Sequence, residues 1–383
     1  MPMLRTHESI DEIAAADWDA LAADDNPFVS HAFLAGLERT GCIRTAFGWR
    51  AQHLTLHEDD GTLVGALPLY LKANSHGEYV FDWAWADAWE RAGGDYYPKF
   101  LCAVPYSPVT GPRLLAGTGP DADERRALLA AALRELTDRT GLSSVHVDFF
   151  SETEIGAFDD TWLERSDWQF QWRNPGDWRD FQDYLGALTH KRRNAIRHER
   201  TQVANAGLEC EFRESGSLSD TEWRSMHHLY EHTFDEKGNT PTLTLDFFRH
   251  LGVAFPHQSH VAFARRGGGI IAGALFLSSH DTLYGRYWGA YEQAAGLHFE
   301  LCYYQGIEHC LRHGLHRFEP GAQGVHKLAR GFLPVRTHSR HYLVDPQFRA
   351  VVRTALQREA VLLERRKHEL LEHSPFAQRD AAP

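Results

Sequence analysis

The chain has 383 residues, of which 43% are hydrophobic and 12% aromatic, and its formal net charge is −12. This composition excludes a disordered chain, and the length exceeds what one hydrophobic core usually supports, so we expect two domains. The acidic balance argues against nucleic-acid binding over a large surface, so any anion site must be a local basic patch.

The five cysteines and the amino terminus predict a cytoplasmic location. The cysteines are odd in number and form no CxxC pair, which favours free thiols in a reducing compartment. The first residues, MPMLRTHESIDEIAAADW, lack the basic region and apolar run of a signal peptide. No window approaches the roughly 20 apolar residues of a membrane span, so none is predicted.

Two segments that resemble each other predict two β-hairpins. GTLVGALPLY begins at Gly61 and GIIAGALFLS begins at Gly269, and each continues to a Ser-His turn. An aromatic second strand follows, EYVFDWAW in the first half and TLYGRYWGAY in the second.

The same order of elements follows each hairpin. A helix with an apolar stripe ends at a glycine, Gly141 or Gly314, and an alternating strand comes next. The stripe residues are Leu128, Leu129, Leu133 and Leu136 in the first half, and Phe299, Tyr303, Ile307 and Leu311 in the second. The repeated order hairpin, helix, glycine, strand predicts a duplicated α/β unit.

The halves differ in the segment between hairpin and helix, where the first carries a long aromatic and proline-rich insertion, residues 81–110. Such a segment is commonly functional in a compact domain. The alternative is a rigid cover packed on the sheet. Near the carboxyl end, residues 347–373 predict a polar helix that packs through Val351, Leu356 and Leu362.

A basic cluster in LTHKRRNAIRHER predicts a phosphate site. Its cations are Lys191, Arg192, Arg193, Arg197 and Arg200. Thr189 is placed to cap the helix, and a helix amino terminus with clustered guanidinium groups suits phosphate. The alternative is a solvated helix face.

Metal, nucleophile and nucleotide-hydrolysis signatures are absent from the sequence. His309 and His313, like His228 and His232, have the i, i+4 spacing of two ligands, but neither pair has a fixed third ligand, so no metal site is predicted. The sequence has no G-x-S-x-G elbow and no GxxxxGK[ST] loop.

The stretch FEPGAQGVHKLARGFLP predicts a ligand loop at the end of the last strand of the second half. Gly321 and Gly324 allow the backbone to approach a ligand closely. Lys327 would then stabilise an oxyanion as an acyl carbonyl becomes tetrahedral, or bind a phosphate statically. A structural lysine is the alternative.

Three segments resemble the FemAB-like family of tandem GNAT-fold N-acyltransferases. They are NPFVSHAFLAGLERTG, HKRRNAIRHERTQVANAGL and GLHRFEPGAQGVHKLARGF, and the resemblance covers about residues 26–345. It implies an α/β protein of two pseudo-repeated GNAT lobes with mixed sheets. In Fem-type enzymes a lysine soon after the last strand stabilises the carbonyl, and VHKLARGF carries that role to Lys327. KRRN resembles the family's basic helix start, at Arg192 and Arg193.

The chain departs from the GNAT pyrophosphate motif Q/R-x-x-G-x-G/A. Its nearest match is QAAGLH, with His298 where glycine or alanine is expected. A long helical arm for tRNA is not visible as a heptad insertion. The resemblance implies either acyl-CoA or aminoacyl-tRNA as the donor substrate, and these departures leave both donors open. No tightly bound cofactor is predicted.

These observations predict an N-acyltransferase that moves an acyl or aminoacyl group to the primary amine of a small molecule or peptide. Lys327 would hold the oxyanion, and Glu319 or His326 would take the amine proton, with Glu300 and Asp87 as weaker candidates. The remaining predicted site residues are Lys191, Arg192, Arg193, Arg197, Gly321 and Gly324 for the donor phosphate, and Asp82, Trp85, Asp87, Tyr97, Tyr106, Tyr287, Trp288, His298 and Glu300 for the pocket.

The predicted domains are residues 1–165, residues 166–345 and a carboxyl-terminal helix and tail, residues 346–383. The rival function is a non-catalytic protein that binds a cell-wall peptide or another anionic ligand on the same fold. A third possibility is a tRNA-dependent ligase, with tRNA as a partner. The sequence makes no prediction of oligomeric state.

Overall fold

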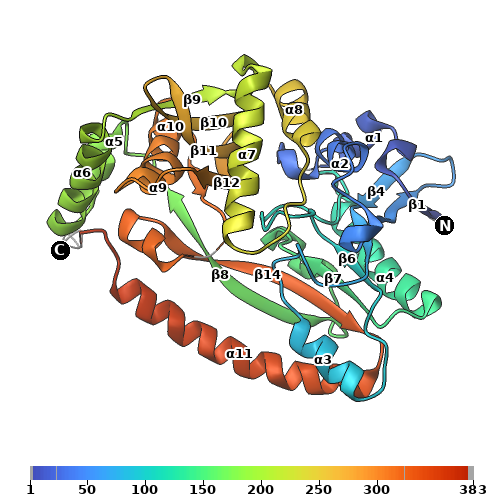
Figure 1. Cartoon of the computed structure of the whole chain (residues 1–383). Helices are drawn as coiled ribbons and strands as arrows, with labels where there is room; N and C mark the ends of the chain where they lie inside the picture. The colour runs from blue at the N-terminus through green and yellow to red at the C-terminus, as the bar shows by residue number, and fades with distance from the viewer. Residues whose placement is uncertain (1–2, 23, 323, 378–383) are drawn as a thin grey trace. The chain divides into compact units, whose positions relative to one another are not determined.

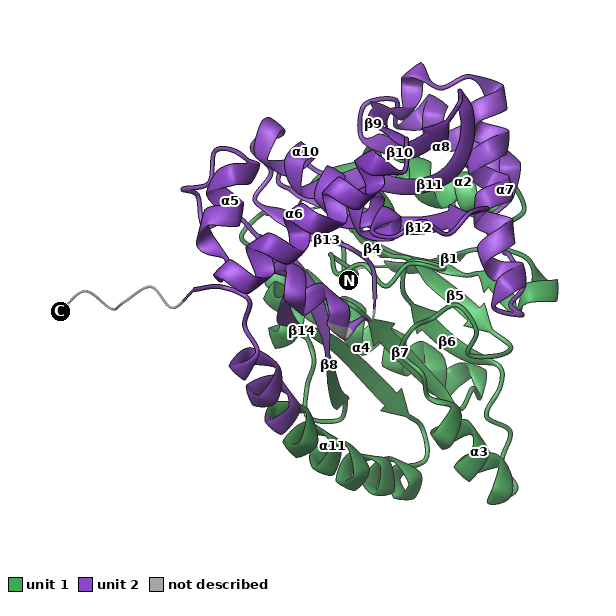
Figure 2. Ribbon diagram, turned by 60° about the vertical axis from the view of Figure 1, so that its left-hand side comes forward, with its two compact units in different colours: residues 1–167, 336–364 green, residues 168–335, 365–383 purple. Residues whose placement is uncertain are grey.

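The computed structural model describes residues 3–22, 24–322 and 324–377 (Figure 1). The chain forms two compact units, unit 1 with residues 1–167 and 336–364 and unit 2 with residues 168–335 and 365–383 (Figure 2). It passes from unit 1 to unit 2 within β8 (Leu163–Arg173) and returns within β14 (Leu333–Leu343). The last helix, α11 (Pro346–Glu372), again crosses the boundary between the units.

Unit 1 contains a mixed sheet with the strand order β2-β5-β6-β7-β14. β6 and β7 are parallel, whereas the other neighbours in this order are antiparallel. A second, antiparallel sheet has the order β1-β3-β4. The bounds are β1 Met3–His7, α1 Ala15–Leu21, α2 His31–Arg39, β2 Trp49–Ala51, β3 His53–His57, β4 Leu63–Leu67, β5 Leu69–Lys72, α3 Trp83–Arg91, β6 Lys99–Cys102, α4 Ala122–Thr140 and β7 Ser144–Asp148, with short 3-10 helices at Ile10–Glu12, Pro27–Val29, Thr45–Phe47 and Glu152–Ala157 (η4).

The predicted helix and strand that follow the first hairpin are confirmed as α4 and β7. Leu129 and Leu133 are fully buried and share one core cluster with Val145 and Val147 of the sheet. Burial of each such side chain contributes about 1.5–3 kcal/mol. Leu128, which we assigned to the same stripe, is 40% exposed, because consecutive residues of a helix lie 100° apart and only one of the two can face the sheet.

The first predicted hairpin is wrong in its second strand. Residues 83–91 form α3, and the strand that pairs with β5 is β6, inside the segment that we interpreted as an insertion. The alternating aromatic residues of FDWAW are typical of a strand, but the side chain between two of them, Asp82, is buried and accepts hydrogen bonds from Lys99, Ser75 and Tyr96. These contacts, made by residues distant in sequence, place Asp82 at the start of a helix.

Unit 2 contains a mixed sheet with the strand order β8-β13-β12-β11-β10-β9. β12 and β13 are parallel and the other neighbours are antiparallel. The second predicted hairpin is confirmed as β11 and β12. The bounds are α5 Phe181–Ala187, α6 His190–Asn205, β9 Glu209–Glu214, α7 Asp220–Glu236, α8 Leu245–Ala254, β10 Ser259–Arg266, β11 Gly269–Ser278, β12 Thr282–Ala290, α9 Leu297–Phe299, α10 Gln305–His313 and β13 Arg317–Glu319, with 3-10 helices at Ser215–Ser217 and Val325–Arg330 (η7).

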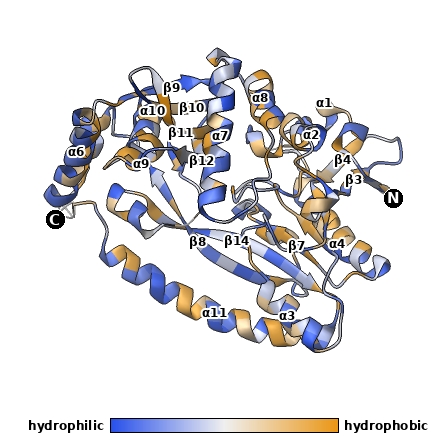
Figure 3. Ribbon diagram, in the orientation of Figure 1, coloured by the Kyte–Doolittle hydropathy of each residue, from blue (hydrophilic) through white to orange (hydrophobic). Residues whose placement is uncertain are grey.

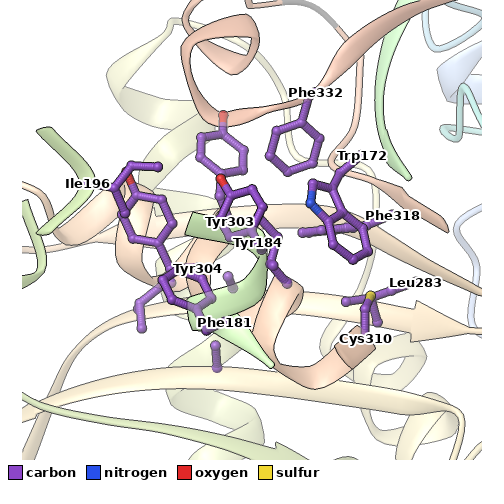
Figure 4. Close-up of a cluster of buried hydrophobic side chains, with 14 of the residues drawn as sticks. Trp172, Phe181, Tyr184, Ile196, Leu283, Tyr303, Tyr304, Cys310, Phe318 and Phe332 are labelled. Atoms are coloured by element: carbon purple, nitrogen blue, oxygen red, sulfur yellow. The ribbon is translucent and has the colours of Figure 1, made fainter. Parts of the chain in front are cut away.

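The predicted helix of the second half contains a π-helical turn, η6 (Glu300–Tyr304), between α9 and α10. Tyr303 and Ile307 of its predicted stripe are buried in the core of unit 2. Figure 4 shows Tyr303 and Tyr304 in this core with aromatic residues of other elements. Gly314 ends the helix in the left-handed conformation, as the sequence predicts.

The carboxyl-terminal helix is confirmed as α11, and of its three predicted packing residues Leu356 is confirmed whereas Val351 and Leu362 are wrong. Val352 and Leu356 are buried against Leu163 and Leu343, whereas Val351 and Leu362 are 66% and 62% exposed. Polar and apolar side chains alternate along α11, and α6 is predominantly hydrophilic (Figure 3). A short apolar contact in a mostly polar helix is a weak pattern, which explains why two of the three predicted residues were misassigned.

The duplicated unit is confirmed by the strand pattern. In unit 1, β7 is parallel to β6 and antiparallel to β14. In unit 2, β13 is parallel to β12 and antiparallel to β8. Both antiparallel neighbours are strands that cross the unit boundary, because residues 168–173 of β8 belong to unit 2 and residues 336–343 of β14 belong to unit 1.

Candidate functional site

The Lys327 side chain is buried in η7 of unit 2, where it is 3% exposed. Its Nζ donates hydrogen bonds to the carbonyl oxygens of Gly321 at 2.7 Å and Ala322 at 2.8 Å. Among the residues that the structure describes, the third Nζ position has no hydrogen-bond partner and no carboxylate lies within ion-pair distance. Burial is the main reason that the pKa of Lys327 falls to about 7, against a smaller opposing effect of Cys302.

The glycine loop contacts the Lys327 side chain through its backbone carbonyl groups, rather than through N–H groups. Gly324 has a φ of +122°, and a Cβ at this position would lie 2.6 Å from the His326 imidazole. Only glycine therefore combines this backbone conformation with the close contact to the His326 ring.

His326 is exposed beside the buried Lys327, and its Nε2 lies 2.8 Å from the Tyr303 hydroxyl. Burial and the positive charges of Lys327 and Arg330 lower the pKa of His326. The imidazole is therefore mostly neutral near pH 7, which is the state that accepts a proton.

Glu319 ends β13 and is half-buried. Its Oε1 accepts a hydrogen bond of 2.6 Å from Gln171 of β8. Glu300 is much less available, since it is 4% exposed and accepts two hydrogen bonds from Arg200 and one from Gln305.

His298 belongs to an aromatic group beside this loop. Its ring lies 5.2 Å from Trp288, 5.4 Å from Tyr303 and 6.0 Å from His326, between ring centroids. Burial is the main cause that lowers its pKa to about 4. Tyr287, the remaining predicted pocket residue of unit 2, instead contacts Tyr230, at a centroid distance of 5.0 Å.

The helix start that corresponds to the GNAT pyrophosphate motif is covered by α6. Gly296 caps α9 with a φ of +82°, and a Cβ there would lie 2.6 Å from the carbonyl oxygen of Glu199. This glycine therefore permits close packing of α6 against α9.

The predicted basic residues lie in the first three turns of α6, but they are not equivalent. Lys191 and Arg197 are exposed, whereas Arg192 and Arg193 are half-buried. Arg193 donates to the carbonyl of Leu188, which precedes the helix. Arg200 is paired with Glu300 and Glu308, so its charge is neutralised within unit 2. The Thr189 side chain occupies the cap position but makes no capping hydrogen bond, which corrects that expectation.

The predicted pocket residues of the first half lie in unit 1. Asp82 and Tyr97 both contact Ser75, at 2.5 Å and 2.7 Å, and Trp85 contacts His341. Tyr106 is separate from this group, since it is buried against Trp49 and its hydroxyl donates to the carbonyl of Cys42. Asp87 is exposed and pairs with Arg91 on α3.

The Asp82 group includes two lysines that the sequence did not single out. Lys99 is fully buried and donates to Asp82 at 2.5 Å and to Glu78 at 2.8 Å. Lys72, opposite it on β5, is also buried, and its Nζ lies 3.7 Å from the Trp49 ring centroid. Burial opposes ionisation of Asp82, but the charge of Lys99 holds its pKa well below the usual range. Isolated lysines in LYLK and YPKFLC carry no signal for this cluster.

Comparison with models of protein families identifies the family of this chain. The FemAB_like family model, described as peptidoglycan biosynthesis/recognition, matches residues 9–378. The chain belongs to the FemAB-like family. No curated protein matches the chain.

Solved structures show the same fold at low identity. FemX is 10% identical, with a TM-score of 0.51, over 92% of this chain and 100% of that one. The C-terminal domain (DUF2156) of a putative lysylphosphatidylglycerol synthetase from Agrobacterium fabrum is 13% identical, with a TM-score of 0.53, over 92% and 98%. A protein of unknown function from Bacteroides thetaiotaomicron is 10% identical, with a TM-score of 0.51, over 90% and 100%. The predicted tandem GNAT fold is confirmed.

Membership in the FemAB-like family supports acyl or aminoacyl transfer at the level of the family. Within the described residues, no group of three or more His, Cys, Asp and Glu side chains is arranged to hold a metal ion. In the same part of the chain, no helix has the length and apolar character needed to cross a membrane.

Proposed function

We propose that this chain is an N-acyltransferase that moves an acyl or aminoacyl group from an activated donor to a primary amine, with its chemical site at the Lys327 loop. The observation that carries the proposal is a buried lysine without a carboxylate partner among the described residues, next to an exposed histidine with a lowered pKa. Buried charges without partners are costly, and perturbed groups of this kind cluster at functional sites.

Lys327 is suited to stabilise the oxyanion of the tetrahedral intermediate. The two loop carbonyls hold Nζ in place before the reaction. The third N–H of the ammonium form is then left to donate to the substrate oxyanion rather than to the loop. A donor fixed in advance near a developing negative charge lowers the barrier without reorganisation, particularly where burial reduces the dielectric response.

His326 is the base that we favour for the amine proton. The neutral acceptor amine attacks the donor carbonyl carbon, a C–N bond forms, and the imidazole takes the proton that the nitrogen loses. The C–O bond of an ester or the C–S bond of a thioester then breaks, and the leaving oxygen or sulfur receives that proton. Glu319 is the second candidate, although Gln171 already occupies one of its oxygens.

The donor phosphate would bind at the start of α6 rather than at the start of α9. Close packing of Glu199 on Gly296 leaves little room for a diphosphate at α9. Among the described residues, Lys191, Arg192, Arg193 and Arg197 form no ion pair, and of these four only Arg193 and Arg197 make side-chain hydrogen bonds, to Leu188 and Gln182. Lys191 and Arg192 are therefore the most available cations of α6. This arrangement favours an aminoacyl-tRNA donor over acyl-CoA, and an amine on a peptide or small molecule as acceptor.

The proposal is tested by turnover with each donor. The protein is incubated with acetyl-CoA or with alanyl-tRNA and a panel of primary amines that includes a lysine-containing peptide, and amide products are detected by mass spectrometry. Ribonuclease treatment should abolish product formation only for the tRNA donor.

Lys327→Met keeps most of the side-chain stem and removes the charge, so it should lower kcat by roughly 10²-fold or more, with a much smaller change in donor affinity. Lys367→Met, at a half-buried lysine of α11, is the matched control and should leave kcat unchanged. Loss of donor binding with unchanged kcat would instead make Lys327 a static anchor. Saturable binding without product from any donor would favour the rival function, a binding protein on the same fold.

A further inference from the structure

The π turn η6 presents two consecutive tyrosines to η7, Tyr303 and Tyr304, whose side chains are drawn in Figure 4. Tyr303 contacts the His326 imidazole, with 2.8 Å between its hydroxyl and Nε2. The Tyr304 hydroxyl accepts a hydrogen bond of 3.0 Å from Arg330 Nε. Consecutive residues of an α-helix point 100° apart, so a local widening of the helix helps both hydroxyls to reach one neighbouring segment. Turns of this type are rare and occur frequently at functional sites.

Arg330 joins three segments of unit 2 through its guanidinium group. Besides the bond to Tyr304, Nη1 donates to the carbonyl oxygen of His326 at 2.9 Å, and Nη2 donates to Glu199 Oε1 of α6 at 2.6 Å. The guanidinium carbon lies 3.3 Å from the centroid of the Phe299 ring. All three guanidinium nitrogens are therefore used, and the side chain is only 9% exposed.

The contacts of Arg330 argue against a direct role in ligand binding. Its charge is already paired with Glu199, which also accepts a hydrogen bond from the Tyr304 hydroxyl. The Tyr184 hydroxyl donates to the backbone carbonyl of Arg330, which fixes the end of η7 as well. A planar group with donors at fixed angles can hold such a junction in one geometry, whereas a lysine ammonium cannot.

We propose that Arg330, together with Glu199, is a positioning residue that fixes His326 and Lys327 of η7 for acyl transfer, an inference that rests on the proposed function. The bond to the His326 carbonyl sets the backbone of the first turn of η7, and the Tyr304 and Glu199 contacts anchor that turn to the π turn and to α6. The imidazole of His326 is then confined between Gly324 and Tyr303. Positioning matters because an error of about 1 Å at the reacting groups can cost roughly 10²-fold in rate.

The charged and titratable groups around His326 supply a readout that does not depend on turnover. His298, Tyr303, Lys327 and Arg330 face its ring or lie within electrostatic reach. Burial, Lys327 and Arg330 each lower the pKa of His326, so removal of the Arg330 charge should raise it. If a substitution at Arg330 only loosened the fold, it would expose the His326 ring whether or not the new side chain is charged, so Arg330→Met and Arg330→Lys would change the pKa alike.

The experiment compares Arg330→Met and Arg330→Lys in the full chain. The His326 imidazole is titrated by NMR, with its resonance assigned from its absence in His326→Gln, and kcat and KM are measured with the active donor. Arg330→Met should lower kcat at least about tenfold with KM changed less than about threefold, and should shift the His326 midpoint to higher pH. Arg330→Lys should keep the low midpoint and recover only part of kcat. Lysine keeps the positive charge but lacks the planar guanidinium group with its donors at fixed angles.

Arg312→Met, at an exposed arginine near the end of α10, is the control and should change neither readout. If Arg330→Met does not fold, Glu199→Gln serves instead, since it keeps the shape of the partner and weakens the anchor. A wild-type kcat with an unshifted His326 midpoint in a folded Arg330→Met variant, or a wild-type kcat in a folded Glu199→Gln variant, would overturn the inference. If the wild type gives no product, the proposed function fails, whereas a His326 midpoint that rises in Arg330→Met and stays low in Arg330→Lys would still show that the Arg330 charge acts on His326.

Discussion

The two units place opposite charges at corresponding positions. In each unit, the strand that is parallel to its predecessor is followed by a six-residue 3-10 helix whose third residue is a buried ionisable side chain. In unit 1 this residue is Glu154, and in unit 2 it is Lys327. Glu154 accepts hydrogen bonds from the backbone N–H groups of Arg113, Leu114 and Ser151, while Lys327 donates to two carbonyls.

The surroundings of the two residues show why only one suits chemistry. Next to Glu154, the fully buried Arg113 donates through its guanidinium to four backbone carbonyls, so the loops of unit 1 are locked by saturated polar contacts. Lys327 instead lies beside the exposed imidazole of His326. At the same step of the duplicated fold, unit 1 therefore has a carboxylate held by backbone N–H groups, and unit 2 has the lysine that we propose for the chemistry, next to an exposed histidine.

The largest expected effect is a loss of unfolding free energy when a buried lysine is replaced by methionine. The substitution is made separately in each unit, at Lys99 and at Lys327. Lys99→Met in unit 1 removes the cation that pairs with Glu78 and Asp82, and should cost about 3–5 kcal/mol of unfolding free energy because two buried carboxylates lose their partner. Lys327→Met should cost far less, since no ion pair is lost among the described residues. Urea unfolding at pH 7 measures both, and equal losses would contradict the distinction between a structural and a chemical lysine.

Anion binding should be confined to the basic helix of unit 2. Arg192→Ala should weaken binding of the phosphorylated donor by about 1.5–3 kcal/mol, or roughly 10–100-fold, because charge-assisted bonds to phosphate are strong. Titration at low salt measures this loss. Arg179→Ala, at an exposed arginine before α5 that pairs with Asp183, is the control, and equal affinities of all three proteins would identify α6 as a solvated face.

The smallest effect is a pH dependence of stability that belongs to Lys327 alone. Its pKa is about 7 in the folded chain against an ordinary 10.5, so between these values the unfolded chain binds more protons and stability rises with pH. The unfolding free energy of the wild type relative to Lys327→Met should therefore increase from pH 7 to pH 9, by at most about 1.4 kcal/mol per pH unit. Urea unfolding at several pH values tests this, and a constant difference would show that Lys327 stays charged when folded.

Sequence reasoning succeeded where a pattern is local and long. The stripes of α4 and α10, the glycines that end both helices and the β11–β12 hairpin follow from periodicity and from backbone conformations that glycine favours. It failed for EYVFDWAW because a strand-like alternation was overridden by contacts with Lys99 and Ser75. It also missed Arg330, whose partners Glu199 and Tyr304 are 131 and 26 residues away.

The sequence by itself determined the duplication, the α/β class and the candidate importance of Lys327, because repeats, hydrophobic periods and glycine-spaced loops are properties of neighbouring residues. Only the tertiary structure decided which charges are neutralised. Arg200 and Lys99 look like free cations in the sequence, but each meets two carboxylates in the fold. Lys327 meets two backbone carbonyls instead, and the energy of a charge depends on such partners and on burial, which no local pattern encodes.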